Sequence, residues 1–549
     1  MRCFRLSAVR VLVLALAASL TLASPATAVD PPAKTAKKAL TKQQKDHQTR
    51  LAAGIQKLLS DPAVARSFWG IKAVTLEGGQ VLYESNADKL FTPASNTKLF
   101  TTAATLALIG PDYRFRTTVE TTAQLDKYGR INGDIALIGR GDPNLSGRVL
   151  PYVYPRAQRT LPPEWVLQDL AAQLIANGVK FVDGNIVGDD SYFAFERYGQ
   201  GWSQEDVFWD YGAPVSALSL NDNVIFVTVQ PGARPGDRAF IQVEPFAAYL
   251  QIDNRATTTP SGSGPAKIGL DRQPGSNVLT IWGNIPADGA GTTYSLAITD
   301  PAEFAAQVFR SILLQRGVVV YGGVRTRHAD APTLFSQAVP VVAAGGGDAS
   351  ITTVPLQPLV LAGHESRPLH EALRVINKES QNLHAEIMLR LLGRERGSGG
   401  TIEGGSEVLK GFLGSAGILP EEYVLLDGSG LSRQNLVTPN AMVKLLAYVD
   451  TQPWAESFRQ TLPVAGTDGT LAIRMRNTVA QGRVFAKTGL LGHVNALSGY
   501  ATTLSGERVA FSIMTNNHNL GSRAAVQVVD QIVQAIVNDV PPASTRKKK

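Results

Sequence analysis

The apolar positions near the start of the chain follow first a helical and then a strand period. A helical stripe begins near Arg50, with apolar members at Leu51, Ile55, Leu58 and Leu59. Residues 68–83 then alternate like two strands around the turn Glu77-Gly78-Gly79. We therefore expect ordered structure to begin at about residue 50 with a helix and a hairpin.

The last third of the chain predicts a sheet followed by a helix. Three alternating stretches read as an antiparallel meander: 483–488, 495–503 and 508–515. One helical stripe follows before Pro541-Pro542, with apolar members at Val526, Val529, Val533, Ile536 and Val540. Helices that flank such a sheet predict the fold class α+β, as a sandwich of sheet and helices.

A further helix is expected from Thr92, which can cap it, with Pro93 in the first helical position and Gly110-Pro111 after its end. Ser95 then falls in the first turn. There its backbone N–H is not committed to the helix, and the positive end of the helix dipole lies close by.

A long insert separates the two parts and contains a weak internal repeat. A helix, a Gly-Val pair, a short strand and a later glycine occur twice, at 163–184 and at 301–323, which predicts two matching α/β units. The stretch 224–294 is rich in strands and turns, so we interpret it as a small nested β domain. The predicted division is 50–118 with 355–541 for the main domain, 119–223 with 295–354 for the insert, and 224–294 for the nested domain.

The two ends are basic and lie outside this predicted fold. Residues 1–28 combine three arginines, a short apolar run and Ala26-Thr27-Ala28, the pattern of a secretory signal peptide. The charges of 1–28 (+3), 29–48 (+3) and 546–549 (+4) leave −3 of the total +7 for the body. A near-neutral, exported body excludes nucleic acid as a partner and predicts a periplasmic or extracytoplasmic protein. The basic linker 29–49 and basic tail 542–549 suggest peripheral contact with membrane lipid or wall polymer, with solvated ends as the alternative.

Several hydrolytic chemistries are excluded by missing motifs. The only cysteine, Cys3, precedes the apolar run, so disulfides, thiol catalysis and a lipid anchor are excluded from the exported form. The chain has no G-x-S-x-G, H-E-x-x-H, H-x-x-E-H or phosphate-loop motif, and seven histidines offer little for a zinc site. We expect no metal and no cofactor.

Three short motifs together point to a serine nucleophile. Ser95-Asn96-Thr97-Lys98 is S-x-x-K, and positions i and i+3 share a helix face, so the Lys98 amine can reach the Ser95 hydroxyl. Burial or a second cation would keep that amine uncharged and able to accept the serine proton. Ser380-Gln381-Asn382 is S-x-N on a predicted connection between helices; Ser219-Leu220-Asn221 matches the same pattern but is interpreted as a coincidence.

The third motif, Lys487-Thr488-Gly489, ends a predicted strand. Lys487 and Gly489 share one strand face, and the lysine with the threonine hydroxyl suits a substrate carboxylate. Gly489 is expected to let a substrate approach the strand edge closely. Each motif is weak alone, but their order and settings are specific to penicillin-binding proteins and related β-lactamases.

Through these three motifs the chain resembles the low-molecular-mass class C penicillin-binding proteins. These are D-alanyl-D-alanine carboxypeptidases/endopeptidases with a serine transpeptidase-like catalytic domain. Besides the motifs, the resemblance is carried by five stretches: 141–145, 216–219, 427–433, 462–466 and 496–500. It implies a penicillin-binding/β-lactamase-like sandwich with two nested inserted domains. It further implies that Ser95 attacks the carbonyl between two D-alanines of peptidoglycan stem peptides, with Lys98 as base, and that β-lactams acylate Ser95.

The resemblance also implies roles for the other motif residues. Ser380 and Asn382 relay a proton and hold the peptide, Lys487 and Thr488 bind the terminal carboxylate, and the N–H groups of Ser95 and Leu490 form an oxyanion hole. Leu490 departs from the family, which usually has a hydroxyl residue there, so the balance of carboxypeptidase and endopeptidase activity stays open. A β-lactamase or esterase with the same serine and lysine, and a non-catalytic penicillin-sensing wall-binding protein, are the alternatives.

Overall fold

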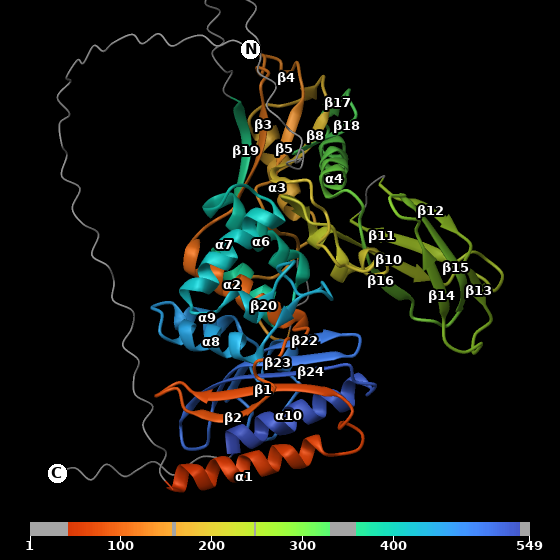
Figure 1. The fold of residues 1–549 in the computed structure, drawn as a ribbon. Coiled ribbons are helices and arrows are strands. Elements are labelled where there is room, and N and C mark those ends of the chain that lie inside the picture. The colour runs from red at the N-terminus through yellow and green to blue at the C-terminus, as the bar shows by residue number, and fades with distance from the viewer. Residues whose placement is uncertain (1–41, 156–160, 246–248, 330–357, 539–549) are drawn as a thin grey trace, which may run out of the picture.

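The computed structural model describes residues 42–155, 161–245, 249–329 and 358–538 (Figure 1). The predicted signal peptide, most of the basic linker and the basic tail lie outside the described residues. No helix within the described ranges combines the length and apolar character needed to cross a membrane.

A five-stranded antiparallel sheet forms the base of the main domain. Its strands, in spatial order, are β2 (Val81–Ser85), β1 (Phe68–Thr75), β24 (Arg508–Asn516), β23 (Val494–Thr502) and β22 (Val484–Leu491). The predicted meander is confirmed as β22, β23 and β24. β22 is the edge strand of this sheet, and the start of its outer edge is covered by a short antiparallel bridge between Val464 and Phe485. Beyond that bridge, no further strand pairs with its outer edge within the described chain.

Helices cover both faces of this sheet, as the sandwich prediction required. Below it in Figure 1 lie α1 (Lys42–Leu59) and α10 (Ser522–Asn538). Phe511 and Ile513 face these two helices, whereas Ala510 and Met514 point into the other layer, as strand alternation dictates. In α10 the predicted members Val529, Val533 and Ile536 are buried; Val540 lies outside the described residues.

The helical layer on the second face holds most of the remaining main-domain elements. Its helices are α2 (Thr97–Leu108), α5 (Leu369–Glu379), α6 (Asn382–Arg396), α7 (Ile402–Ser415), α8 (Pro439–Asp450) and α9 (Ala455–Thr461). A small hairpin, β20 (Tyr423–Val424) with β21 (Leu436–Val437), closes this layer.

The insert is an α/β unit built on a second five-stranded sheet. The strand order is β18 (Val324–Ala329), β8 (Ile186–Ala194), β5 (Ile135–Ile138), β3 (Arg116–Thr121) and β19 (Leu359–Glu365). A smaller sheet joins β17 (Val319–Val320), β7 (Phe181–Val182) and β4 (Arg130–Ile131). A short parallel pair, β6 (Asp142–Leu145) with β9 (Leu218–Leu220), completes the strands.

The internal repeat corresponds to two matching units that lie side by side. The two predicted helices are α3 (Trp165–Ala176) and α4 (Pro301–Gln315), and the strands after them pair in parallel, β7 with β17 and β8 with β18. The first pairing sets Phe181 opposite Val319, which is one residue before Val320, the position that matches Phe181 when the Gly-Val pairs of the two units are aligned.

The stretch expected to form the nested domain contains strands and turns. One sheet orders β11 (Phe240–Glu244), β10 (Val224–Gln230) and β16 (Thr292–Ala297). The second joins β12 (Gln251–Asn254), β15 (Val278–Pro286), β13 (Thr257–Thr259) and β14 (Lys267–Asp271). Buried residues of these sheets, such as Val227 and Leu279, belong to the same apolar cluster as Phe304 of α4.

Two expected boundaries differ from the structure. The first helix begins at Lys42 and not near Arg50, so part of the predicted basic linker is helical. β19 lies in the range assigned to the main domain, but it pairs antiparallel with β3 as the edge of the insert sheet. Pairing with a strand more than 230 residues earlier has no local signature in the sequence.

Candidate active site

Ser95 lies in a short 3-10 turn, η1 (Ala94–Asn96), and α2 begins two residues later at Thr97. The expected helix start at Thr92 is therefore wrong. The Thr92 backbone bonds instead to the Asn516 side chain, with its N–H donating to Oδ1 at 2.7 Å and its carbonyl accepting from Nδ2 at 3.2 Å. Ala94 then adopts φ +48°, a left-handed conformation that alanine rarely takes, and this delays the helix.

Two glycines allow the chain to pack tightly around this turn. A Cβ on Gly430, whose φ is +81°, would lie 1.9 Å from the Ala94 carbonyl oxygen. A Cβ on Gly489 would lie 2.6 Å from the Pro93 oxygen. The side-chain position of Gly489 is thus occupied by the nucleophile turn, so packing of this turn also requires a glycine here. The approach of a substrate to Gly489 stays a prediction.

The Lys98 amine is fully buried and makes three hydrogen-bond contacts. Its Nζ lies 2.9 Å from Ser95 Oγ, 2.6 Å from Asn382 Oδ1 and 2.6 Å from the Ser429 carbonyl oxygen. Burial lowers the pKa of Lys98 to about 7, and the nearby carboxylates Asp427 and Glu386 oppose that shift. Of the two causes named by the sequence argument, burial is the one that operates.

These contacts match the hydrogen-bonding capacity of an uncharged lysine. The Asn382 and Ser429 oxygens only accept hydrogen bonds, so they use the two N–H groups of a neutral amine. A charged Lys98 donates to Ser95 Oγ, whereas an uncharged Lys98 has a lone pair left that can accept from the Ser95 hydroxyl. The arrangement suits transfer of the Ser95 proton to Lys98.

The S-x-N motif connects two helices, as predicted. Ser380 lies between α5 and α6 with φ +63°, and Asn382 is the first residue of α6. The Asn382 amide is held from both sides: Nδ2 donates to the Tyr211 carbonyl at 2.8 Å, so Oδ1 is presented to Lys98. Tyr211 acts here through its backbone carbonyl.

The K-T-G motif lies on β22 and meets the S-x-N motif directly. Lys487 Nζ donates to Ser380 Oγ at 2.8 Å and to the Thr488 carbonyl at 2.9 Å. Burial, with a smaller effect from the Lys98 charge, lowers the pKa of Lys487 well below its ordinary value. Thr488 Oγ1 lies 2.9 Å from Thr470 Oγ1, and Leu490, on the same strand face, is 57% exposed.

The structure thus gathers the predicted site residues into one connected group. Ser95, Lys98 and Asn382 are joined directly, and Ser380 is joined to Lys487. Asn96, with its amide oriented so that Nδ2 donates to the Lys487 carbonyl at 2.7 Å, ties the S-x-x-K turn to the K-T-G strand. Asn96 occupies a variable position of its motif, so the motif alone does not select it.

A buried carboxylate supports the loop that contacts Lys98. Glu386 Oε1 accepts from the backbone N–H groups of Gly428 and Ser429 at 2.9 and 2.8 Å, and its other oxygen pairs with Arg390. Burial raises the pKa of Glu386 to about 6. Glu386 belongs to none of the three motifs and was not predicted, although the loop that it supports, 427–433, is one of the stretches that carry the family resemblance.

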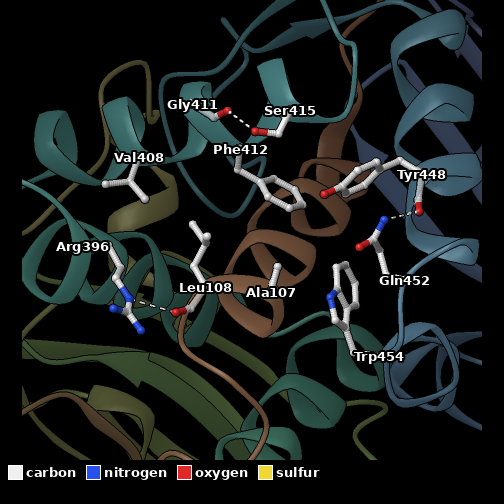
Figure 2. Close-up of a pocket in the computed structure, with 10 residues that line it drawn as sticks. All are labelled: Ala107, Leu108, Arg396, Val408, Gly411, Phe412, Ser415, Tyr448, Gln452 and Trp454. Carbon is white, nitrogen blue, oxygen red and sulfur yellow. Dashed lines mark hydrogen bonds between the residues drawn. The ribbon is translucent and has the colours of Figure 1, made fainter. Parts of the chain in front are cut away.

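A hollow of about 470 Å³ on the helical layer lies apart from this group (Figure 2). Its lining residues are Ala107, Leu108, Arg396, Val408, Gly411, Phe412, Ser415, Tyr448, Gln452 and Trp454. Ala107 and Leu108 end α2, whereas Lys98 is near its start, which separates them by about 14 Å along the helix axis. The hollow therefore does not belong to the Ser95 site.

An α+β sandwich that brings S-x-x-K, S-x-N and K-T-G to one sheet edge is typical of the penicillin-binding and β-lactamase-like class of serine hydrolases. Residues 51–345 and 325–538 match the profile of the D-Ala-D-Ala carboxypeptidase 3 (S13) family. The chain therefore belongs to this family of serine-type peptidases.

Individual relatives agree with that assignment. A D-alanyl-D-alanine carboxypeptidase of Actinomadura sp. (strain R39) is 36% identical over 490 residues, which cover 87% of this chain and 83% of the relative. The carboxypeptidase DacB of Haemophilus influenzae is 26% identical, over 82% and 86% of the two chains. The crystal structure of penicillin-binding protein 4 from H. influenzae matches the fold with a TM-score of 0.72 at 24% identity, covering 88% of this chain and 99% of that one.

Proposed function

We propose that the chain is an exported serine D-alanyl-D-alanine carboxypeptidase and/or endopeptidase, which trims or cleaves peptidoglycan peptides through an acyl-enzyme on Ser95. The observation that carries the proposal is the contact set of Lys98, which holds its buried amine 2.9 Å from Ser95 Oγ, within reach of the serine proton once the amine is uncharged. Export rests on the pattern of residues 1–28.

In the acylation step the Ser95 proton moves to Lys98 while Oγ bonds to the carbonyl carbon between two D-alanines. The N–H groups of Ser95 and Leu490 stabilise the negative oxygen, since β22 is an edge strand that an extended peptide can join. The C–N bond then breaks, and the departing amine takes a proton relayed through Ser380. Water hydrolyses the ester, which restores Ser95 and releases the shortened peptide.

Lys487 and Thr488 bind the substrate carboxylate. The buried Lys487 has a lowered pKa in the free protein, and an incoming carboxylate raises it again, so substrate binding recruits the positive charge when it is needed. Penicillin carries a comparable carboxylate beside a reactive amide and acylates the same serine. A relative of this fold, the H. influenzae protein, has been crystallised with a β-lactam, in accord with this expectation.

Incubation with defined muropeptides, followed by mass spectrometry, tests the proposal. The wild-type chain is expected to release D-alanine or to cleave cross-links, and Ser95→Ala is expected to do neither. Intact-protein mass after penicillin treatment distinguishes the alternatives, because an adduct that persists for minutes indicates the peptidase and rapid turnover indicates a β-lactamase. Peptide cleavage that survives in Ser95→Ala contradicts the proposal.

A further inference from the structure

An ion pair in the interior joins the insert to the residue before the S-x-N motif. Arg148 donates to both carboxylate oxygens of Asp222, at 3.1 and 2.8 Å, and also to Glu379 at 3.3 Å. The Arg148 and Asp222 side chains are only 4% and 9% exposed. Buried charges of this kind require well-fixed partners, unlike exposed ion pairs. Glu379 directly precedes Ser380, so the guanidinium connects the insert to the motif.

The position of Asp222 is itself fixed by an unusual turn. Asn221, Asp222 and Asn223 form η4 and have φ values of +53°, +58° and +56°. Left-handed backbone is costly for non-glycine residues, although asparagine and aspartate tolerate it best. The Asn221 side chain donates to the Val224 carbonyl, and that of Asn223 to the Pro214 carbonyl at 2.8 Å. This turn includes the end of the Ser219-Leu220-Asn221 pattern, which the sequence analysis interpreted as a coincidence.

Asp222 also reaches the helix that follows the motif. His384 Nε2 lies 2.9 Å from Asp222 Oδ1, and the imidazole is fully buried. Because a carboxylate only accepts hydrogen bonds, Nε2 carries the proton and donates it. His384 is two residues after Asn382 on α6. One aspartate of the insert therefore contacts residues connected to both sides of the S-x-N motif.

The main domain supplies the opposing contacts around Ser380. Lys378 pairs with Asp468 at 2.5 Å, and Ser380 Oγ accepts from Lys487. Consecutive residues before Ser380 are thus tied in two directions, Lys378 to the main domain and Glu379 to the insert. Such contacts over-determine the left-handed conformation of Ser380, which would otherwise relax.

We propose that Arg148 and Asp222 of the insert are positioning residues that hold Ser380 and Asn382 in register with Lys98 and Lys487. The insert is then a working part of the catalytic centre, since its Tyr211 carbonyl also orients the Asn382 amide. The consequence for catalysis rests on the proposed function, whereas the positioning itself does not.

Arg148→Lys tests the proposal. Lysine keeps the buried positive charge but lacks the planar guanidinium that donates hydrogen bonds to Asp222 and Glu379 together. The acylation rate constant with a fluorescent penicillin is expected to fall about tenfold or more, as small displacements of catalytic groups do. Glu379→Gln is a milder second variant, because it leaves the Arg148–Asp222 pair intact. Its acylation rate constant is also expected to be lower than that of wild type. Arg130→Lys is the matched control: it makes the same substitution in the pair of Arg130, on β4, with Asp183, far from the motif (Figure 1). Its acylation rate should stay within about twofold of wild type.

A double-mutant cycle separates positioning from a general structural loss. In a Ser380→Ala/Asn382→Ala background, Arg148→Lys is expected to cause almost no further loss, because the groups it positions are gone. Hydrogen–deuterium exchange supplies a readout that needs no activity. Arg148→Lys should speed exchange in peptides covering 376–389 and leave β24 unchanged.

Each of these measurements either supports or overturns the positioning role of Arg148 and Asp222. A variant that acylates within twofold of wild type, or a loss that persists in full in the Ser380→Ala/Asn382→Ala background, overturns the positioning role. If wild type is not acylated at all, the proposed function fails, and the exchange data alone decide: faster local exchange supports the positioning role and unchanged exchange overturns it.

Discussion

Lys98 couples the reactivity of Ser95 to pH, because only the uncharged amine can accept the serine proton. With a pKa of about 7 for Lys98, the uncharged fraction is about 1% at pH 5 and about 90% at pH 8. The rate constant for acylation by penicillin should therefore rise about ninetyfold over that interval and level off above it. The rise is expected with increasing pH, since deprotonation creates the base.

Glu386→Gln should move this profile by an amount that the structure bounds. The Glu386 carboxylate contacts the Ser429 N–H at 2.8 Å, and Lys98 contacts the Ser429 carbonyl at 2.6 Å. With about 3.7 Å for the backbone of one residue, the two charges lie at most about 9 Å apart. At an effective dielectric constant of about 20 this separation gives an attraction of about 1.8 kcal/mol, or about 1.3 pH units. Removing the carboxylate lowers the pKa of Lys98, so the midpoint should shift to lower pH by about that amount.

The assay is the second-order rate of labelling with a fluorescent penicillin from pH 5 to pH 9 at constant ionic strength. Circular dichroism at each pH confirms that the variant stays folded, because Arg390 loses its buried partner. A flat wild-type profile refutes the role of Lys98 as base. A midpoint that does not move in Glu386→Gln refutes the electrostatic part of the reasoning.

Three further outcomes are expected. Leu490→Thr places a hydroxyl on the strand face of Thr488 and should lower KM for a peptide with a free D-alanine carboxylate by about tenfold or less, the contribution of one hydrogen bond. D-alanine release measures this KM, and an unchanged value contradicts the prediction. Gly430→Ala should slow acylation by more than about tenfold and lower the melting temperature, because its Cβ would meet the Ala94 carbonyl. As a control, the Cβ of Gly414→Ala in α7 meets nothing within 4 Å, so this variant should raise the free energy of unfolding by up to about 1 kcal/mol. Ile532→Ala, under the face of the sheet opposite Ser95, should cost about 3 kcal/mol in chemical denaturation with no change in acylation rate; a slower rate would contradict this division of the two faces.

The sequence predicted the elements whose pattern is local and strongly periodic. The meander of β22, β23 and β24, the buried stripe of α10 and the repeated units of the insert all follow from apolar spacing. The helical start at Lys42 was missed because its first turns are polar and show no stripe. The partner of β19 was missed because strand pairing across the whole insert depends on tertiary structure.

The candidate site was predictable where side-chain identity defines the chemistry. Ser95, Lys98, Ser380, Asn382 and Lys487 could be selected because hydroxyl, amine and amide groups at those spacings are rare in combination. The carbonyls of Tyr211 and Ser429 were not predictable, since every residue carries one. The packing role of Gly489 likewise depends on a turn that comes from almost 400 residues earlier in the chain.

The low proton affinity of Lys98 comes from the exclusion of water, and carboxylates nearby work against it. Any loosening that admits solvent between the insert and α6 would return the amine to its aqueous state, as an ammonium ion with no lone pair to offer. Local openings need no more free energy than global unfolding and often much less. Under mild denaturant the protein should therefore stop reacting while its backbone signals remain native.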